Sequence, residues 1–314
     1  MSGKTGIEWT DSTWNPIRGC SRVSEGCRNC YAEGVAARFS HPAKQGYITE
    51  WGEAQGFRNE GPYHGLIAKS GQWNGQIKIA DHLMDWPLRK RKPQRIFVNS
   101  MSDLFHENVP DDVIDRIFAV MLAAHWYTFQ VLTKRPQRMK EYVNERFHDL
   151  PPHIWMGVSV EDQATANERI PLLLDTPAAV RWVSAEPLLG PVVLNRYLFV
   201  GAEGGIDFAH TPRQLLHWIV CGGESGRNAR PMHPEWARSL RDQCEAAGVP
   251  FLFKQWGEWL PDGQQSSHDI PAIASSQPRA IPFHRFDENT SGSKVGKKAA
   301  GRLLDGVLHD AYPD

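Results

Sequence analysis

The chain has 314 residues, and because 41% of them are hydrophobic it can bury a sizeable core, in the size range of a single α/β barrel. Its 35 Lys and Arg residues nearly balance 36 Asp and Glu residues, so the formal net charge of −1 excludes a chain-wide attraction to nucleic acid or membrane. No apolar run approaches the ~20 residues of a membrane span, and the first residues lack the apolar stretch of a signal peptide. We therefore expect a cytoplasmic protein with no membrane partner, in a compartment where thiols stay reduced.

The first quarter of the chain predicts a strand, a helix and an irregular insertion. The stretch EWTDSTWNPIRGC (8–20) can hold the first strand, and CYAEGVAARF (30–39) can form the first helix. Residues 40–75 are rich in Gly, aromatic and polar residues, which indicates an insertion after that helix. QIKIA (76–80) predicts the second strand, and residues 81–90 predict a short helix.

From residue 95 onward, short apolar segments rich in β-forming residues alternate with segments whose apolar residues recur at helical spacing. We predict strands at 95–100, 127–133, 154–160, 180–185, 217–222 and 250–255, and helices at 110–125, 136–147, 162–175 and 233–248. Short apolar strands separated by helices are typical of a parallel sheet with helical crossovers.

The total of about eight strands is the number that closes a (β/α) barrel, so we expect an α/β fold of the TIM-like barrel type. An open doubly wound sheet is the alternative. No Gly-x-Gly-x-x-Gly follows a strand, which argues against a dinucleotide-binding fold. We expect one domain, with the barrel over residues 1–259 and a C-terminal extension over 260–314 that packs on it.

Polar side chains recur at the carboxyl ends of the predicted strands, where barrels carry their active sites. The candidates for ligand contact are Asn99, Ser100, Asp103, Lys134, Ser159, Glu161, Glu186, Glu224 and Lys254. A polar residue after a strand is often a helix cap instead, and Asp103 or Asp162 could be that. Their recurrence on one rim predicts a ligand site, and the glycines of CGGESG (221–226) would let backbone approach the ligand closely.

Three of the five cysteines, Cys20, Cys27 and Cys30, lie within eleven positions. An odd number of thiols cannot all pair as disulfides, so the loop at 19–31 predicts a metal site or a reactive thiol. Zinc would need a fourth ligand, from a histidine or a distant cysteine, and a thiol cluster without metal is a further alternative. We favour an iron–sulfur cluster held by the three thiolates, because three ligands leave one iron of a [4Fe–4S] cluster open to bind and reduce a ligand.

A three-cysteine loop after the first strand of a β/α barrel resembles the radical S-adenosylmethionine superfamily. The spacing here, Cys-x6-Cys-x2-Cys, is longer than the usual Cys-x3-Cys-x2-Cys, and Asn29 stands where an aromatic residue is usual. The usual Gly-Gly-Glu does not follow the second predicted strand. The resemblance implies a [4Fe–4S] cluster on the three cysteines, S-adenosyl-L-methionine as a second cofactor, and an electron donor such as flavodoxin or ferredoxin.

Longer blocks also carry a resemblance, among them WNPIRGCSRVSEGCRNCYAE (14–33), VLTKRPQRM (131–139) and IVCGGESGRNARPM (219–232). They resemble a phage- and prophage-associated family of three-cysteine-motif proteins that is regarded as radical-SAM-like. The resemblance implies an enzyme that acts on nucleic acid or a nucleotide. Under this hypothesis Lys134, Glu224 and Lys254 are catalytic candidates that contact the substrate. The candidates for S-adenosylmethionine contact are Asn99, Ser100, Asp103, Ser159, Glu161 and Glu186.

The alternative function is a non-enzymatic protein that binds nucleic acid or a partner protein and uses a structural iron–sulfur or zinc site. Basic clusters at 89–95, 134–138 and 294–302 can hold phosphates, and aromatic side chains of the insertion can stack unpaired bases. Those aromatic residues are Tyr47, Trp51, Phe57, Tyr63 and Trp73. The simpler interpretation is that the cluster at 89–92 is a solvated helix end and that the aromatic residues pin a long loop. We expect single strands to bind better than duplex, which a barrel mouth cannot admit.

Overall fold

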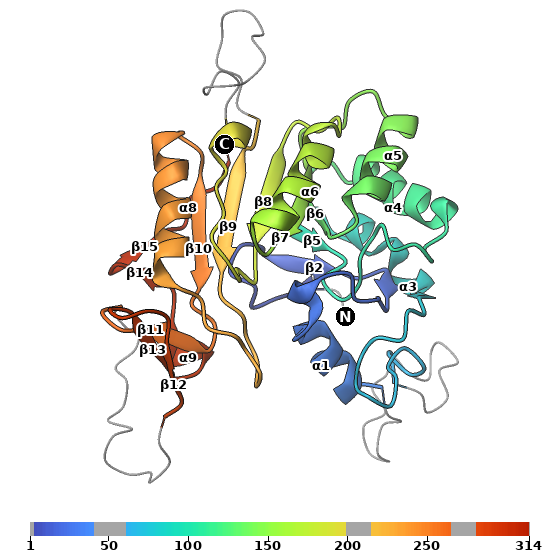
Figure 1. Ribbon diagram of the computed structural model, residues 1–314. Coiled ribbons are helices and arrows are strands. Elements are labelled where there is room, and N and C mark those ends of the chain that lie inside the picture. The colour runs from blue at the N-terminus through green and yellow to red at the C-terminus, as the bar shows by residue number, and fades with distance from the viewer. Residues whose placement is uncertain (1–2, 41–60, 199–214, 265–280, 314) are drawn as a thin grey trace, which may run out of the picture. The chain divides into compact units, whose positions relative to one another are not determined.

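The computed structural model describes residues 3–40, 61–198, 215–264 and 281–313 (Figure 1). The chain divides into two compact units, residues 1–135 and residues 136–314. This division falls inside the segment predicted as a barrel, 1–259. Three aromatic residues of the predicted insertion lie outside the described residues, namely Tyr47, Trp51 and Phe57.

The first unit is organised around parallel strands joined by a helix. Its parallel strands are neighbours in the order β2 (Ser12–Trp14), β5 (Arg95–Val98) and β6 (Thr128–Thr133). α4 (Asp111–Ala123) makes the crossover from β5 to β6, and it buries apolar residues at helical spacing, such as Ile114 and Ile117. The strands predicted at 95–100 and 127–133 and the helix predicted at 110–125 are confirmed.

The predicted second strand at 76–80 forms, but outside the parallel sheet. β4 (Lys78–Ile79) pairs antiparallel with β3 (Ile17–Arg18) in a separate two-stranded ladder. Lys78 is exposed and Ile79 half-buried, which suits a short ladder at the surface, whereas parallel strands are normally covered on both faces. Including this segment in the barrel count was therefore wrong.

Short helices of the unit are η1 (Glu25–Cys27), α1 (Tyr31–Arg38), α3 (Asp81–Met84) and η2 (Trp86–Arg89).

The second unit repeats the alternation of parallel strand and helix. Its strands are parallel neighbours in chain order, β7 (Ile154–Val160), β8 (Arg181–Ala185), β9 (Trp218–Gly222) and β10 (Phe251–Gln255). Its helices include α5 (Pro136–Arg146), α6 (Gln163–Leu174), α7 (Asn195–Leu198) and α8 (Pro234–Ala246). Figure 1 shows α8 beside β9 and β10, which it contacts. The strands and helices predicted from residue 136 to residue 255 are confirmed.

Close packing explains several residue choices in this second sheet. β7 is buried along its whole length, as a strand covered on both faces should be. A Cβ atom at Gly157 would lie 2.5 Å from the indole of Trp182, so only glycine leaves room for that ring. Asp162 accepts a hydrogen bond from the backbone of Thr165 and caps α6, which confirms its interpretation as a helix cap.

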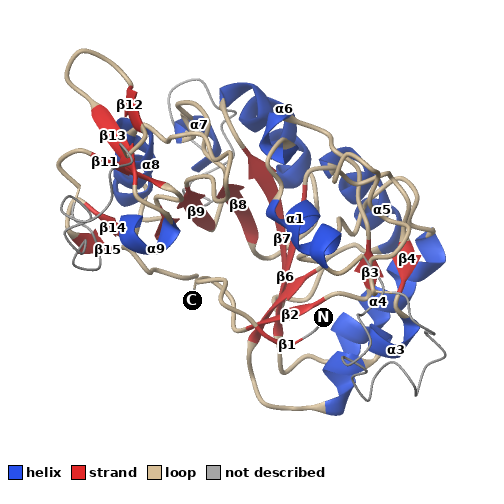
Figure 2. Cartoon of the chain, turned by 90° about the horizontal axis from the view of Figure 1, so that it is seen from below, coloured by secondary structure: helices blue, strands red, loops and turns tan. Residues whose placement is uncertain are grey.

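The extension after β10 forms small antiparallel elements. β11 (Trp259–Pro261), β13 (Ser291–Lys294) and β12 (Phe283–Arg285) form a three-stranded sheet in that order, visible in Figure 2. α9 (Lys297–Ala300) and the pair β14 (Leu303–Leu304) and β15 (Val307–Leu308) follow. Residues 309–311 then run antiparallel along β10, with Leu252 opposite Asp310 and the Phe253 backbone N–H donating to the His309 carbonyl at 3.0 Å.

Both units have the predicted mixed α/β architecture of parallel strands with helical crossovers. The structure does not show a closed barrel. In the first unit, β1 (Gly3–Lys4) pairs antiparallel with the edge of β2, and in the second unit residues 309–311 occupy the edge of β10. None of the helices in the described ranges is long and apolar enough to span a bilayer.

The Asp305 carboxylate fastens the extension to α8. It accepts hydrogen bonds from Arg238 at 2.6 and 3.0 Å, from Arg241 at 2.7 Å and from Gln264 at 2.7 Å. The Arg238 hydrogen bonds, against a smaller opposing effect of burial, hold the pKa of Asp305 well below its usual range. Because the folded-state pKa is depressed, the stabilisation is present above the unfolded pKa of about 3.9 and is lost as the pH falls below it.

Replacing Asp305 by Asn should lower the free energy of unfolding by about 1–2 kcal/mol at pH 7, after a discount for partial exposure. Asn tolerates the left-handed backbone at this position, where φ is 53°, so the loss reports on the charge. Urea denaturation at pH 7 and pH 3 measures both values, and the difference between variant and wild type should shrink at pH 3. Asp242→Asn, which removes an exposed pair with Arg241, is the control and should change little. An equal loss at both pH values would contradict the expectation.

Candidate functional site

The three clustered cysteines lie in the first unit, on the segment that leads from β3 to α1. Cys20 follows β3, Cys27 ends η1, and Cys30 is the residue before α1. All three are free thiols and partly buried, whereas Cys221 on β9 and Cys244 on α8 are fully buried in the second unit. The clustered thiols therefore differ from the other two in having access to solvent and to a ligand.

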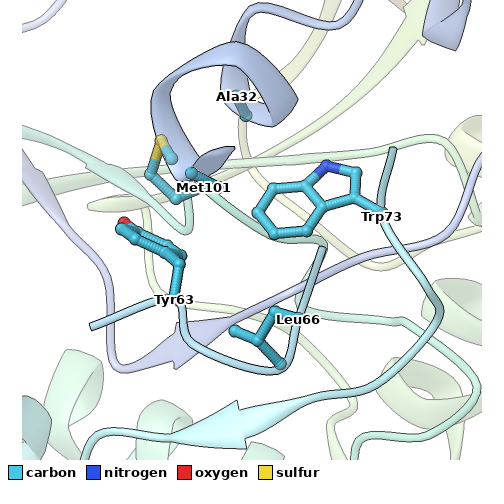
Figure 3. Close-up of a cluster of buried hydrophobic side chains, with 6 residues drawn as sticks. Ala32, Tyr63, Leu66, Trp73 and Met101 are labelled. Carbon is cyan, nitrogen blue, oxygen red and sulfur yellow. The ribbon is translucent and has the colours of Figure 1, made fainter. Parts of the chain in front are cut away.

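A hydrophobic cluster packs against this loop, and Figure 3 labels most of its members. It consists of Ala32, Ala36, Tyr63, Leu66, Trp73 and Met101, and Cys20 and Cys30 pack against it. Burial raises the pKa of Cys20 to about 12, and the negative charges of Asp103 and of the other two thiolates add to the rise. The three sulfurs therefore lie close enough to influence one another electrostatically.

The Arg135 side chain connects the end of β6 to the cysteine loop. Its guanidinium lies 3.8 Å from Cys20 Sγ and donates to Ser21 Oγ at 2.7 Å. It also pairs with Asp103 at 3.2 Å and with Glu107 at 2.8 Å, and only 10% of the side chain is exposed. Arg135 belongs to the predicted basic cluster at 134–138, but these contacts direct it inward, away from any phosphate at the surface.

The Asp103 carboxylate holds Arg135 in place. It accepts hydrogen bonds from the Thr133 hydroxyl at 2.7 Å and from the backbone N–H groups of Phe105 and Lys134, each at 3.0 Å. With Arg135 added, both carboxylate oxygens have donors from two strand ends. The predicted contact of Asp103 with a cofactor stays a prediction, and the structure adds that this carboxylate positions Arg135.

A second guanidinium, that of Arg22, lies near the other two thiols. It pairs with both carboxylate oxygens of Glu33, at 2.5 and 3.0 Å, and Glu33 also accepts from the Trp73 backbone N–H at 3.0 Å. The pKa of Arg22 is raised, first by the Glu33 hydrogen bonds and then by the charges of Glu33, Cys30 and Cys27. We did not predict Arg22 or Glu33. The available signal was a carboxylate in the first turn of α1, on the face that the helix buries.

The end of β5 presents a buried amide with no partner. Asn99 is 2% exposed and has φ of 60°, and neither its side-chain nitrogen nor its oxygen has a hydrogen-bond partner among the described residues. The next residue, Ser100, donates its hydroxyl to Asn15 at 3.1 Å, and its carbonyl accepts from Tyr31 at 2.6 Å. Buried amides are nearly always satisfied, so Asn99 is the predicted cofactor contact that still has both groups available for a ligand.

Four of the other predicted site residues lie in the second unit and form ion pairs, namely Glu161, Glu186, Glu224 and Lys254. Lys254 on β10 pairs with Glu186 after β8 at 2.6 Å, and Gln255 donates to Ser225 at 2.9 Å. The oxygen of the Gln255 side chain is buried without a partner in the part of the chain described. The unit therefore brings the predicted Glu186 and Lys254 together, beside an open hydrogen-bond acceptor.

Two further predicted carboxylates are held by arginines of the same unit. Glu161 pairs with the buried Arg169 at 3.1 Å, and Arg169 also donates to the Ser159 carbonyl at 2.8 Å. Glu224 receives two hydrogen bonds from the Arg230 guanidinium, at 2.6 and 3.0 Å. These pairs account for the carboxylates as local structural elements. The Glu186–Lys254 pair is the stronger candidate for ligand contact in this unit.

One protein family matches nearly the whole chain, including the candidate residues of both units. The model of a family described as Protein of unknown function (DUF5131) matches residues 4–313. Neither a curated protein nor a solved structure matches the chain. The family match includes the cysteine loop, Asn99 and the Glu186–Lys254 pair.

Gly19, immediately before Cys20, fixes the path of the cysteine loop. Its φ is +96°, and a Cβ atom would lie 2.1 Å from the Gln76 carbonyl oxygen. Replacing it by Ala should lower the free energy of unfolding by about 1–3 kcal/mol, because the backbone must move. Gly34→Ala is the matched control, since nothing lies within 4 Å of that Cβ and Ala favours the helix by about 0.5–1 kcal/mol. Urea denaturation followed by Trp fluorescence should give opposite signs, and a loss of the same size in both variants would refute the constraint.

Proposed function

We propose that this chain, which belongs to the DUF5131 family, is an iron–sulfur enzyme of the radical S-adenosylmethionine type. In this proposal Cys20, Cys27 and Cys30 hold a [4Fe–4S] cluster. The carrying observation is that three free, partly buried thiols share one loop. The proposal also includes two expectations from the sequence. The parallel strands would belong to a β/α barrel, and the protein would be associated with phages.

Three cysteine thiolates in one loop are a ligand set that a four-iron cluster uses, with each thiolate on a different iron. In the described ranges, no group of three or more Cys, His, Asp or Glu side chains is placed to hold a metal ion. The proposal therefore rests on the ligand type and on the shared loop of the cysteines, and not on a preformed site. His106, a neighbour of the loop, uses both ring nitrogens, one with Ser21 at 2.9 Å and one with the Asn108 backbone at 3.1 Å.

Two cations near the loop would favour bound thiolates, in opposition to the burial that raises the pKa of Cys20. Thiolates bring negative charge to a partly buried loop, and such charge is stabilised by nearby cations. Arg135 reaches Cys20, and Arg22 lies within electrostatic range of Cys27 and Cys30. Each guanidinium is held by a carboxylate, Asp103 or Glu33, so both are fixed in position before a ligand binds.

A bound cluster of this type, with S-adenosylmethionine on its open iron, supplies the electron that breaks the sulfonium bond and generates a carbon radical. The residues of this chain would bind and orient the ligand. Asn99 offers one acceptor and two donors, which match a polar group that itself donates and accepts. The hydrophobic cluster that packs against the loop would exclude water from one side of the site. A flavodoxin- or ferredoxin-type donor would supply the reducing electron.

A second candidate function is a single-stranded nucleic acid binder with a structural metal, and it rests on a row of rings in the extension. Ring centroids are 6.1 Å apart for Trp259 and His284, 4.8 Å for His284 and Phe286, and 5.0 Å for Phe286 and His233. Lys294 lies over the Trp259 ring, and aromatic rows flanked by cations can stack unpaired bases. The same surface would serve a nucleic acid substrate of the enzyme. Formation of 5′-deoxyadenosine from S-adenosylmethionine separates the two functions.

Protein purified without oxygen should be brown and contain about four iron atoms per chain, as full occupancy of one cubane cluster requires. Replacing Cys20, Cys27 or Cys30 by Ala should remove most of the iron and the visible absorption. Cys244→Ala is the control, since it removes a fully buried thiol on α8, away from the cysteine loop in sequence and in the second unit. Iron analysis and electronic spectra measure the outcome. Stoichiometric zinc without iron would overturn the assignment.

Replacing Asn99 by Gly should weaken S-adenosylmethionine binding at least about tenfold, the equivalent of 1.4 kcal/mol, because the buried amide is lost. Glycine accepts the left-handed backbone at this position, so the fold should be retained. Equilibrium dialysis with the iron-loaded protein measures affinity, and 5′-deoxyadenosine formation measures turnover. Asn289→Gly, in an exposed turn of the second unit, is the control. Unchanged affinity in Asn99→Gly would exclude Asn99 as a ligand contact.

A further inference from the structure

Arg18, on β3 in the first unit, is a buried cation with no carboxylate partner among the described residues. Only 8% of the residue is exposed. No ion pair among the described residues includes Arg18, and its Nε has no hydrogen-bond partner there. Within the described ranges its guanidinium makes one long hydrogen bond, to the Pro62 carbonyl at 3.3 Å. An uncompensated buried charge is strongly destabilising, so its presence requires an explanation.

Tyr63, whose ring lies beside Arg18, carries a second polar group without a partner among the described residues. The Arg18 guanidinium lies 5.7 Å from the centre of the Tyr63 ring. Tyr63 is fully buried, and its hydroxyl has no partner in the part of the chain described. In Figure 3 that hydroxyl lies at the end of the ring that faces away from Trp73. Arginine can only donate hydrogen bonds and a phenol readily donates one, so together they suit a ligand that accepts.

Further positive charge lies next to Arg18. In the β3–β4 ladder Arg18 stands directly opposite Lys78, an unfavourable arrangement of like charges unless an anion lies between or beside them. Lys78 is exposed and donates to the His64 carbonyl at 2.6 Å. Burial, and then the charge of Arg18, lower the pKa of His82, although Asp81 opposes the effect. The positive charge of Arg18 therefore acts on the His82 side chain.

We propose that Arg18 and Tyr63 form a binding site for a small oxyanion, the phosphate or carboxylate group of a ligand. A guanidinium matches two oxygens of either group with parallel hydrogen bonds, and the Tyr63 hydroxyl supplies a third donor. Arg18 precedes Cys20 by two residues, so a ligand anchored here would have its anionic end beside the cysteine loop. The proposal does not depend on the iron–sulfur chemistry, because it requires only the side chains of the first unit.

The test is thermal unfolding of the full chain in increasing inorganic phosphate, with potassium chloride at matched ionic strength as the reference. The midpoint of the wild type should rise with phosphate and saturate, as binding to the folded state requires. Arg18→Met should abolish the response, and Tyr63→Phe should weaken the phosphate affinity severalfold. Without phosphate, Arg18→Met should be no less stable than the wild type, because it removes a buried charge that lacks a partner. Arg89→Met, which breaks an exposed pair with Asp85, is the control and should retain the response.

A wild-type midpoint that rises no more with phosphate than with chloride would overturn the proposal, and so would a full response in Arg18→Met. Competition then identifies the source of the oxyanion. If the site takes the carboxylate of S-adenosylmethionine, that compound should displace phosphate and its decarboxylated form should not. If it takes a phosphate of the substrate, adenosine monophosphate should displace phosphate and adenosine should not.

Discussion

One carboxylate, that of Asp103, determines the arrangement of the candidate site in the first unit. It joins the carboxyl ends of β5 and β6 through Thr133 and Lys134, and it fixes the guanidinium of Arg135. Arg135 is mostly buried, so without this partner it would carry an uncompensated charge. Because Arg135 also contacts Cys20 and Ser21, the position of the cysteine loop depends on an interaction made at two other strand ends.

Local sequence patterns were sufficient to predict the helices and parallel strands. The apolar run of β7 and the helical spacing of apolar residues in α4 are properties of adjacent residues, and they hold wherever the segment packs. The gathering of the three cysteines in one loop also followed from their spacing in the chain. The short ladder of β3 and β4 was not predicted. A two-residue strand has too few positions for the sequence to indicate whether one face or both faces are buried.

The contacts within the site could not be predicted, since they join residues far apart in the chain. Arg135 and Cys20 are separated by 115 positions, and the basic cluster at 134–138 was interpreted as a phosphate-binding surface. The polar residues after the strands were recognised, but their partners decide their roles. Arg169 and Arg230 neutralise Glu161 and Glu224, whereas Asn99 is left with both polar groups unpartnered among the described residues. A sequence shows which polar groups are present, and only the fold shows which are already satisfied.

The pairing of residues 309–311 with β10 has a consequence for how the protein is made. The parallel strands of the second unit leave the ribosome well before the segment that covers their edge. During that interval β10 exposes backbone donors and acceptors that can pair with another chain. Until residues 309–311 emerge, this uncovered edge is a place where a second chain can add a strand to the unit.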